Sequence, residues 1–104
     1  MFARMTVFQS TPDSVDGAFR FAVRDAVESV DRAPGLLGFF DLSDRGSGRS
    51  VIVTLWATRE DRAASAERAK AAVERIAEAG GEKVVSVRDY EVGYHLLTEE
   101  LLAQ

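Results

Sequence analysis

The stretch VIVTLWATRED, residues 51–61, decides the fold. Its first six residues are mostly β-branched or aromatic, which is typical of a strand in a buried or half-buried sheet. Thr58 stands three residues before Asp61, and this spacing resembles a capping box with Asp in place of Glu. We therefore predict a strand that ends at Trp56. After it we predict a helix from about residue 60 to residue 79, ended by Gly80-Gly81.

A hairpin precedes this strand. Residues 43–48 are polar and rich in glycine, so they predict its tip. The strand before the tip, Leu36–Leu42, carries the adjacent aromatics Phe39 and Phe40, and this pattern predicts a strand buried on both faces.

Alternating residues predict a first strand over residues 2–9. Apolar residues then recur at helical spacing up to residue 30, in a helix that we expect to start at Thr11-Pro12 and to stop before Pro34. Residues 83–94 read as the last strand. Its apolar side chains divide into two sets, with Val85 and Val87 on one face and Val84, Tyr90, Val92 and Tyr94 on the other.

The predicted order is strand, helix, strand, strand, helix, strand. It indicates an α+β fold, a ferredoxin-like βαββαβ sandwich with an antiparallel sheet over residues 1–95, followed by a tail at residues 96–104. Because apolar residues fall on both sheet faces, the face that helices leave uncovered must meet something. We expect a homodimer with the sheets packed face to face. Leu97 and Leu101 lie one helical turn apart, so we expect the tail to pack on the partner subunit or across its own helices.

Composition excludes several classes of function. The 104 residues carry a net charge of −4, which argues against a nucleic-acid binder. No apolar run approaches the ~18 residues of a membrane span. The chain has no cysteine and a single histidine, so we expect no metal site, and a cytoplasmic location is the default expectation.

With Pro34-Gly35, Gly38-Phe39 and Leu55-Trp56 in these places, the chain resembles the antibiotic biosynthesis monooxygenase superfamily, the dimeric α+β barrels, over about residues 2–95. The resemblance implies a cofactor-independent monooxygenase-like protein that acts on a small aromatic or quinol-type substrate, with Trp56 in the pocket. The haem-degrading branch uses an Asn on the first strand and a His on the second helix. This chain has no Asn and no His on that helix, so haem degradation is not expected.

Several side chains are candidates for a substrate site. Trp56, Phe19, Phe39 and Phe40 can supply apolar walls, and Arg4 a polar group that needs a buried partner such as Asp41 or Asp89. Trp56, Tyr90 and His95 are weak candidates for catalytic residues, and Tyr90, His95 or a buried carboxylate could act as the base. For each there is a plainer alternative: core packing for Trp56, packing or an interface for Tyr90, a surface position for His95 and a structural ion pair for Arg4. The charged residues of the second helix, Arg68 among them, read as its solvated face.

Three functions compete on this basis. The first is an oxygenase, which needs an apolar cavity and an electron-rich substrate anion. The second is a non-catalytic dimeric module that binds a small ligand. The third, RNA binding through the same βαββαβ order, needs stacking aromatics on the third strand, where this chain has aliphatic residues.

Overall fold

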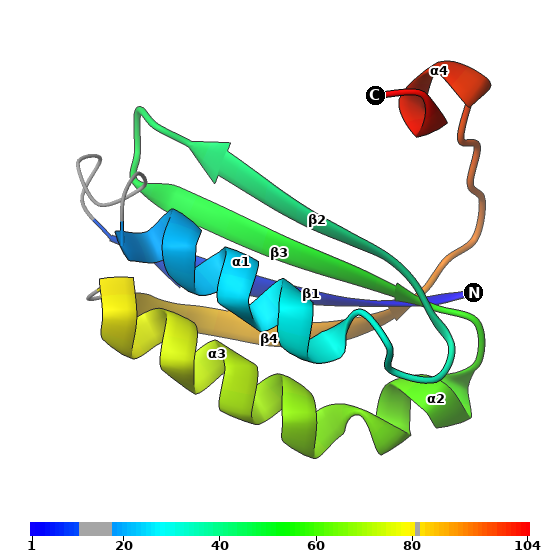
Figure 1. Ribbon diagram of the computed structural model, residues 1–104, viewed down its shortest axis with the longest axis horizontal. Helices are drawn as coiled ribbons and strands as arrows, with labels where there is room; N and C mark the ends of the chain where they lie inside the picture. Colours follow the sequence, from blue (N-terminus) through cyan, green and yellow to red (C-terminus); the bar gives the residue numbers. More distant parts are fainter. Residues whose placement is uncertain (11–17, 81) are drawn as a thin grey trace.

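A four-stranded antiparallel sheet forms one layer of the computed structural model, and two long helices pack against one of its faces (Figure 1). The structure describes residues 1–10, 18–80 and 82–104, without the side chains of residues 18–22, 29 and 80. The elements in chain order are β1 (Phe2–Gln9), α1 (Ala18–Val30), β2 (Leu36–Asp44), β3 (Arg49–Trp56), α2 (Arg59–Ala64), α3 (Ala66–Gly80), β4 (Lys83–Glu91) and α4 (Glu99–Leu102).

The sheet order is β2-β3-β1-β4, and each neighbouring pair is antiparallel. The predicted α+β class and βαββαβ order are therefore confirmed, and β3 ends at Trp56 as expected. The expected helix start at Thr11-Pro12 lies outside the described residues. Gly35 has a φ of +78°, a conformation that glycine adopts without strain, and it turns the chain from α1 into β2.

The second helical segment is two helices, where the sequence predicted one. Thr58 caps α2 as predicted, since its hydroxyl accepts a hydrogen bond from the backbone N–H of Asp61 at 3.0 Å. The break falls at Ser65, which is buried and whose hydroxyl donates to the carbonyl of Arg62 at 2.7 Å. The backbone N–H of Ser65 still bonds to the Asp61 carbonyl at 3.2 Å, so the interruption between α2 and α3 is slight. A serine that bonds its own backbone competes with the helix, and this accounts for the break.

In the single chain β2 is not buried on both faces as predicted: its residues are half-buried or exposed, because β2 is an edge strand and helices cover only one sheet face. The predicted division of the valines of β4 between the two faces is wrong. The register between β1 and β4 shifts at Val7/Phe8. Val84 pairs with Phe8 and Val87 with Thr6, so both fall on the helix side, where strict alternation had separated them.

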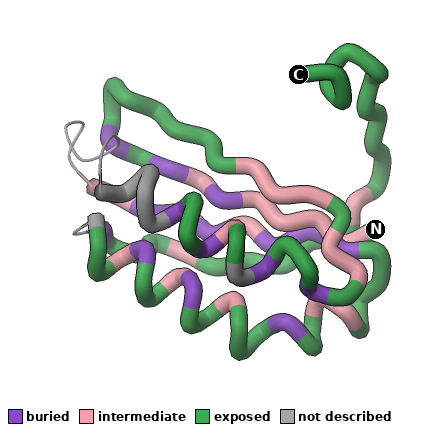
Figure 2. Tube along the Cα trace, in the orientation of Figure 1, coloured by how far each residue is buried: buried purple, intermediate pink, exposed green. Residues whose placement is uncertain are grey.

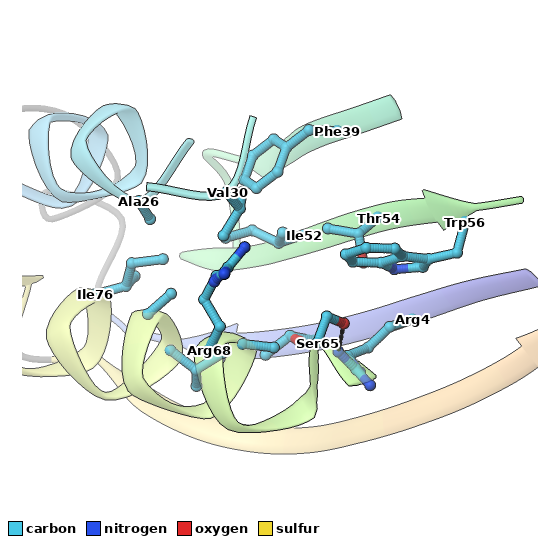
Figure 3. Close-up of a pocket in the computed structure, with 14 residues that line it drawn as sticks. Arg4, Ala26, Val30, Phe39, Ile52, Thr54, Trp56, Ser65, Arg68 and Ile76 are labelled. Carbon is cyan, nitrogen blue, oxygen red and sulfur yellow. Dashed lines mark hydrogen bonds between the residues drawn. The ribbon is translucent and has the colours of Figure 1, made fainter. Parts of the chain in front are cut away.

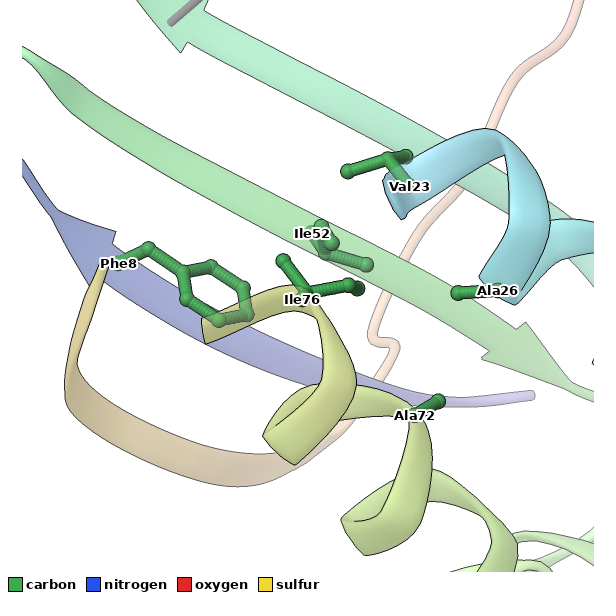
Figure 4. Close-up of a cluster of buried hydrophobic side chains, with 6 residues drawn as sticks. All are labelled: Phe8, Val23, Ala26, Ile52, Ala72 and Ile76. Atoms are coloured by element: carbon green, nitrogen blue, oxygen red, sulfur yellow. The ribbon is translucent and has the colours of Figure 1, made fainter. Parts of the chain in front are cut away.

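The core lies between the sheet and the paired helices (Figure 4). Even-numbered residues of β1 and β3 point toward the helices, because side chains alternate along a strand. The buried cluster joins Phe8 of β1 and Ile52 of β3 to residues of α1 and α3, namely Val23, Ala26, Ala72 and Ile76. Small alanines let the helices lie close to the sheet and to each other.

The other sheet face carries no helix and is lined with apolar side chains. Met5, Val53 and Phe40 form one cross-strand row on it, and the next row joins Val7, Val51 and Leu42.

Beyond β4, residues 93–104 are exposed along their whole length (Figure 2). They run away from α1 and α3 and end in α4, which stands off the body (Figure 1). We expected the tail to pack either on the partner subunit or across its own helices. The second of these positions is wrong. Among the described helices, none is long and apolar enough to cross a membrane.

Candidate functional site

A cavity opens between the helix-facing side of the sheet and the two long helices (Figure 3). Its unfilled space is about 530 Å³, a volume that includes its opening to solvent. The enclosed part is much smaller. It measures about 50 Å³ as traced by the centres of water molecules, which is room for only a few waters. A larger ligand therefore needs side chains to move. The lining residues are Arg4, Thr6, Ala26, Val30, Phe39, Ile52, Thr54, Trp56, Ser65, Arg68, Ala69, Ala72, Val73 and Ile76.

Trp56 forms one end of the cavity. It is the last residue of β3 and points to the helix side, where it is 2% exposed. Its indole N–H donates to the Thr54 hydroxyl at 2.9 Å, two residues earlier on the same strand face. The polar atom of the ring is thus satisfied locally, as we expected, and its apolar face is left for packing or for a ligand.

The Arg4 side chain lines the cavity from β1, and its guanidinium donates to three different groups. Its Nε donates to Asp89 of β4 at 3.2 Å, its Nη1 to the Ser65 hydroxyl at 3.3 Å and its Nη2 to the Arg62 carbonyl at 3.1 Å. Asp89, one of its two expected partners, is therefore the ion-pair partner. The same network fixes the break between α2 and α3 against β1, so Arg4 supports the fold and presents a cation to the cavity.

Phe39 lines the cavity, whereas Phe40 lies on the opposite sheet face. Phe39 pairs with Thr54 and Phe40 with Val53, and successive residues of a strand point to opposite faces. The side chain of Phe19, expected to form part of the wall, lies outside the described residues. The structure thus brings Trp56, Phe39 and Arg4 together and places Phe40 elsewhere.

The two candidate bases lie outside the cavity. Tyr90 pairs with Ala3 on the helix-free face and is 45% exposed, and His95 belongs to the exposed segment after β4. Among the described residues that line the cavity there is no His, Tyr, Asp or Glu. The charged groups there are two guanidiniums, Arg4 and Arg68. The lining is therefore suited to an apolar ligand that carries negative charge, once side chains move to admit it.

Arg68 is exposed, as its predicted place on the solvated face of the second helix implied, and it also lines the cavity. Its spacing in the sequence indicated this second role. Arg68, Ala72 and Ile76 stand four residues apart, so they share one stripe of α3, and the structure turns that stripe to the cavity.

Solved structures share this arrangement of sheet and helices. A protein from Deinococcus radiodurans assigned to the antibiotic biosynthesis monooxygenases matches 94% of this chain over 98% of its own, with a TM-score of 0.72 and 12% identity. The chain has the antibiotic biosynthesis monooxygenase fold. The resemblance read from the sequence is thus confirmed at the level of fold.

Two further structures with the monooxygenase fold match at similar levels. One, from Nitrosomonas europaea and assigned to the same family, is 24% identical over 90% of this chain and all of its own, with a TM-score of 0.66. The other is SnoaB from Streptomyces nogalater, a cofactor-independent oxygenase, which is 13% identical over 91% of this chain and 95% of its own, with a TM-score of 0.67. No family model and no curated protein matches the sequence.

Proposed function

We propose that this chain is a cofactor-independent monooxygenase-like protein whose substrate, a small aromatic or quinol-type molecule, binds in the cavity against Trp56. The observation that carries the proposal is the cavity itself. It joins an aromatic wall of Trp56 and Phe39 to two cationic side chains in otherwise apolar surroundings. The structural match to SnoaB, a cofactor-independent oxygenase, supports the same reaction class.

The reaction fits a site that has cations and no conventional base. A dihydroxyarene and O₂ give a hydroxyquinone and water, so one oxygen atom enters each product and the substrate supplies all the electrons. The substrate must first lose a phenolic proton to become an electron donor. A guanidinium beside a phenol lowers the pKa of that phenol, so Arg4 and Arg68 favour the anion. Water at the open mouth takes the proton.

A second function is favoured by the same lining. Because the described part of the cavity wall holds no His, Tyr, Asp or Glu, a non-catalytic dimeric module that binds a small ligand would need no further residue. This module and the oxygenase share the cavity and differ only in whether O₂ is consumed.

We also propose that two copies pair through their helix-free sheet faces. The rows Met5–Val53–Phe40 and Val7–Val51–Leu42 form a continuous apolar surface there, and Leu42 is 53% exposed in the single chain. Contiguous exposed apolar surface of this kind is uncommon on monomers. An identical sheet offers a matching surface under two-fold symmetry.

The test measures oxygen uptake with 1,4-dihydroxynaphthalene in ¹⁸O₂. An oxygenase accelerates formation of 2-hydroxy-1,4-naphthoquinone that carries one ¹⁸O atom, with one O₂ consumed per product. Spontaneous oxidation gives hydrogen peroxide and a quinone without ¹⁸O. We expect Trp56→Phe to slow the enzymatic reaction by about tenfold, as expected for loss of a positioning contact. Tyr94→Phe, at a position 84% exposed, is the control and keeps full activity. Uptake no faster than in buffer, with the ligand bound, favours the non-catalytic module.

A further inference from the structure

Arg68 stands at the mouth of the cavity. From α3 its side chain extends toward α1, and the guanidinium is drawn beside Val30 (Figure 3). Arg68 also lines two shallower hollows outside the cavity. One is shared with Glu28, Asp31 and Arg32, and the other lies beside Pro34 and Asp61. A molecule entering between the helices would therefore meet this side chain first.

Among the described residues, the Arg68 guanidinium takes part in no hydrogen bond or ion pair, whereas Arg4 is paired with Asp89 at 3.2 Å. The described cavity wall contains no carboxylate. Arg68 itself is exposed, so water solvates its guanidinium until a ligand arrives. A ligand that fills the mouth would displace this water, and a carboxylate on that ligand would then form a charge-assisted hydrogen bond with the guanidinium.

The acidic residues that share hollows with Arg68 do not remove this preference. Asp61, in one hollow, is half-buried with its carboxyl against Gly35. Glu28 and Asp31 share the other hollow with Arg68, and both are exposed. A pair formed there would lie in water, where ion pairs contribute little. An acidic group on a ligand inside the cavity would be shielded from water by the ligand's own ring and by the helices. It would therefore bind the Arg68 guanidinium more strongly than Glu28 or Asp31 would.

We infer that Arg68 selects ligands with a carboxylate, so that the site takes aromatic carboxylic acids, their ring system against Trp56 and Phe39 and their acid group at the mouth. This inference rests on the proposed cavity site and names its substrate class. The guanidinium is planar and presents a fork of N–H donors, which matches the two oxygens of a carboxylate. Because the enclosed space is small, the flexible arginine side chain must also shift as the ligand enters, and binding to the carboxylate fixes its new position.

The experiment uses two probes that do not react with oxygen, 2-naphthoate and its neutral amide 2-naphthamide. Isothermal titration calorimetry at pH 7 gives Kd for both on the full-length chain. We expect naphthoate to bind about tenfold or more tightly than the amide, the ratio that a hydrogen bond between charged groups gives. Arg68→Gln should bring the two Kd values within about threefold by weakening naphthoate binding alone. Arg68→Lys should restore part of the preference.

Lys70→Gln is the matched control, since it removes one positive charge from the same helix at a residue that does not line the cavity. It should leave the Kd ratio unchanged. Equal affinity of the wild type for both probes, or an acid preference that survives Arg68→Gln, overturns the role of Arg68 and leaves the cavity as a ligand site. If neither probe binds or changes the fluorescence of Trp56, the only tryptophan, the cavity site fails and both proposals fall together.

Discussion

Trp56 and Thr54 form a local pair on one face of β3, with the indole N–H donating to the threonine hydroxyl at 2.9 Å. They stand two residues apart, so the pleat points both side chains to the helices. The bond satisfies the one polar atom of a nearly buried ring without help from another element. It also fixes the ring at the end of the cavity, where both proposed functions need it.

Thr54→Val tests this pair. The substitution keeps the branched shape and leaves the indole N–H without a partner, so we expect the free energy of unfolding to fall by about 1–3 kcal/mol. Urea unfolding followed by circular dichroism measures it. Thr6→Val is the control, because Thr6 lines the same cavity and its hydroxyl makes no hydrogen bond within the described chain. Equal losses in the two variants would show that the indole bond contributes nothing specific.

Much of the fold around the cavity could be predicted from the sequence. The β-branched run of β3 and its closing Trp56, the cap at Thr58 and the need of Arg4 for an acidic partner all follow from short-range rules, and the structure shows each. These features depend on residues close in sequence or on one buried charge. Their physical causes can therefore be read without knowing the packing.

The features that the sequence did not reveal depend on packing between elements. The break at Ser65 is held against the sheet by Arg4, 61 residues away, whose guanidinium donates to the serine hydroxyl. The shift at Val7/Phe8 is a property of two paired strands and has no marker in either. Arg68 is exposed, as its charge suggested, and what the sequence analysis missed is that its spacing with Ile76 also places it at the cavity.

Asp89→Asn should destabilise the end of the sheet. Asp89 Oδ1 lies 3.2 Å from Arg4 Nε and 3.7 Å from Arg62 Nε, so its loss leaves two guanidiniums without their counter-ion. The carboxylate is 45% exposed, which screens the interaction, and we expect a loss of about 1–2 kcal/mol in the free energy of unfolding. Glu91→Gln, at an exposed position on the same strand, should cost little. A chemical-denaturation curve for Asp89→Asn that overlays the wild type would contradict the ion-pair role.

Asp44 should titrate below its ordinary range. The Ser47 hydroxyl donates to its Oδ2 at 2.9 Å and the Gly46 N–H to its Oδ1 at 3.0 Å, and these bonds lower the pKa of the carboxyl in the folded chain. A lowered folded pKa means that the hairpin gains stability above the unfolded pKa and loses it as pH falls through the folded pKa. Carboxyl NMR titration measures the midpoint, and Ser47→Ala should move it upward. An unchanged midpoint in Ser47→Ala would exclude the hydroxyl as the main cause.

Val53→Lys tests the proposed dimer. Val53 stands between Met5 and Phe40 in the centre of the helix-free face, so a lysine there places two like charges in any face-to-face pair. We expect light scattering to give a dimer for the wild type, twice the 11.4 kDa chain, and a monomer for the variant. Val87→Lys is the control. It puts the same residue at a position 52% exposed on the opposite face, and should leave the dimer intact. A monomeric wild type would refute the pairing outright.

The tail gives the last test, because its leucines are exposed in the single chain. The backbone N–H of Val92 bonds to the Met1 carbonyl at 3.0 Å, and beyond this point the chain leaves the sheet. Leu96 and Leu102 are 73% and 75% exposed. Leaving such side chains in water forgoes about 1.5–3 kcal/mol each, so a partner surface that covered them would bind the tail. We therefore expect deletion of residues 96–104 to lower the melting temperature and weaken the dimer on dilution. A truncated chain with unchanged mass and melting temperature would mean that the tail docks on neither subunit.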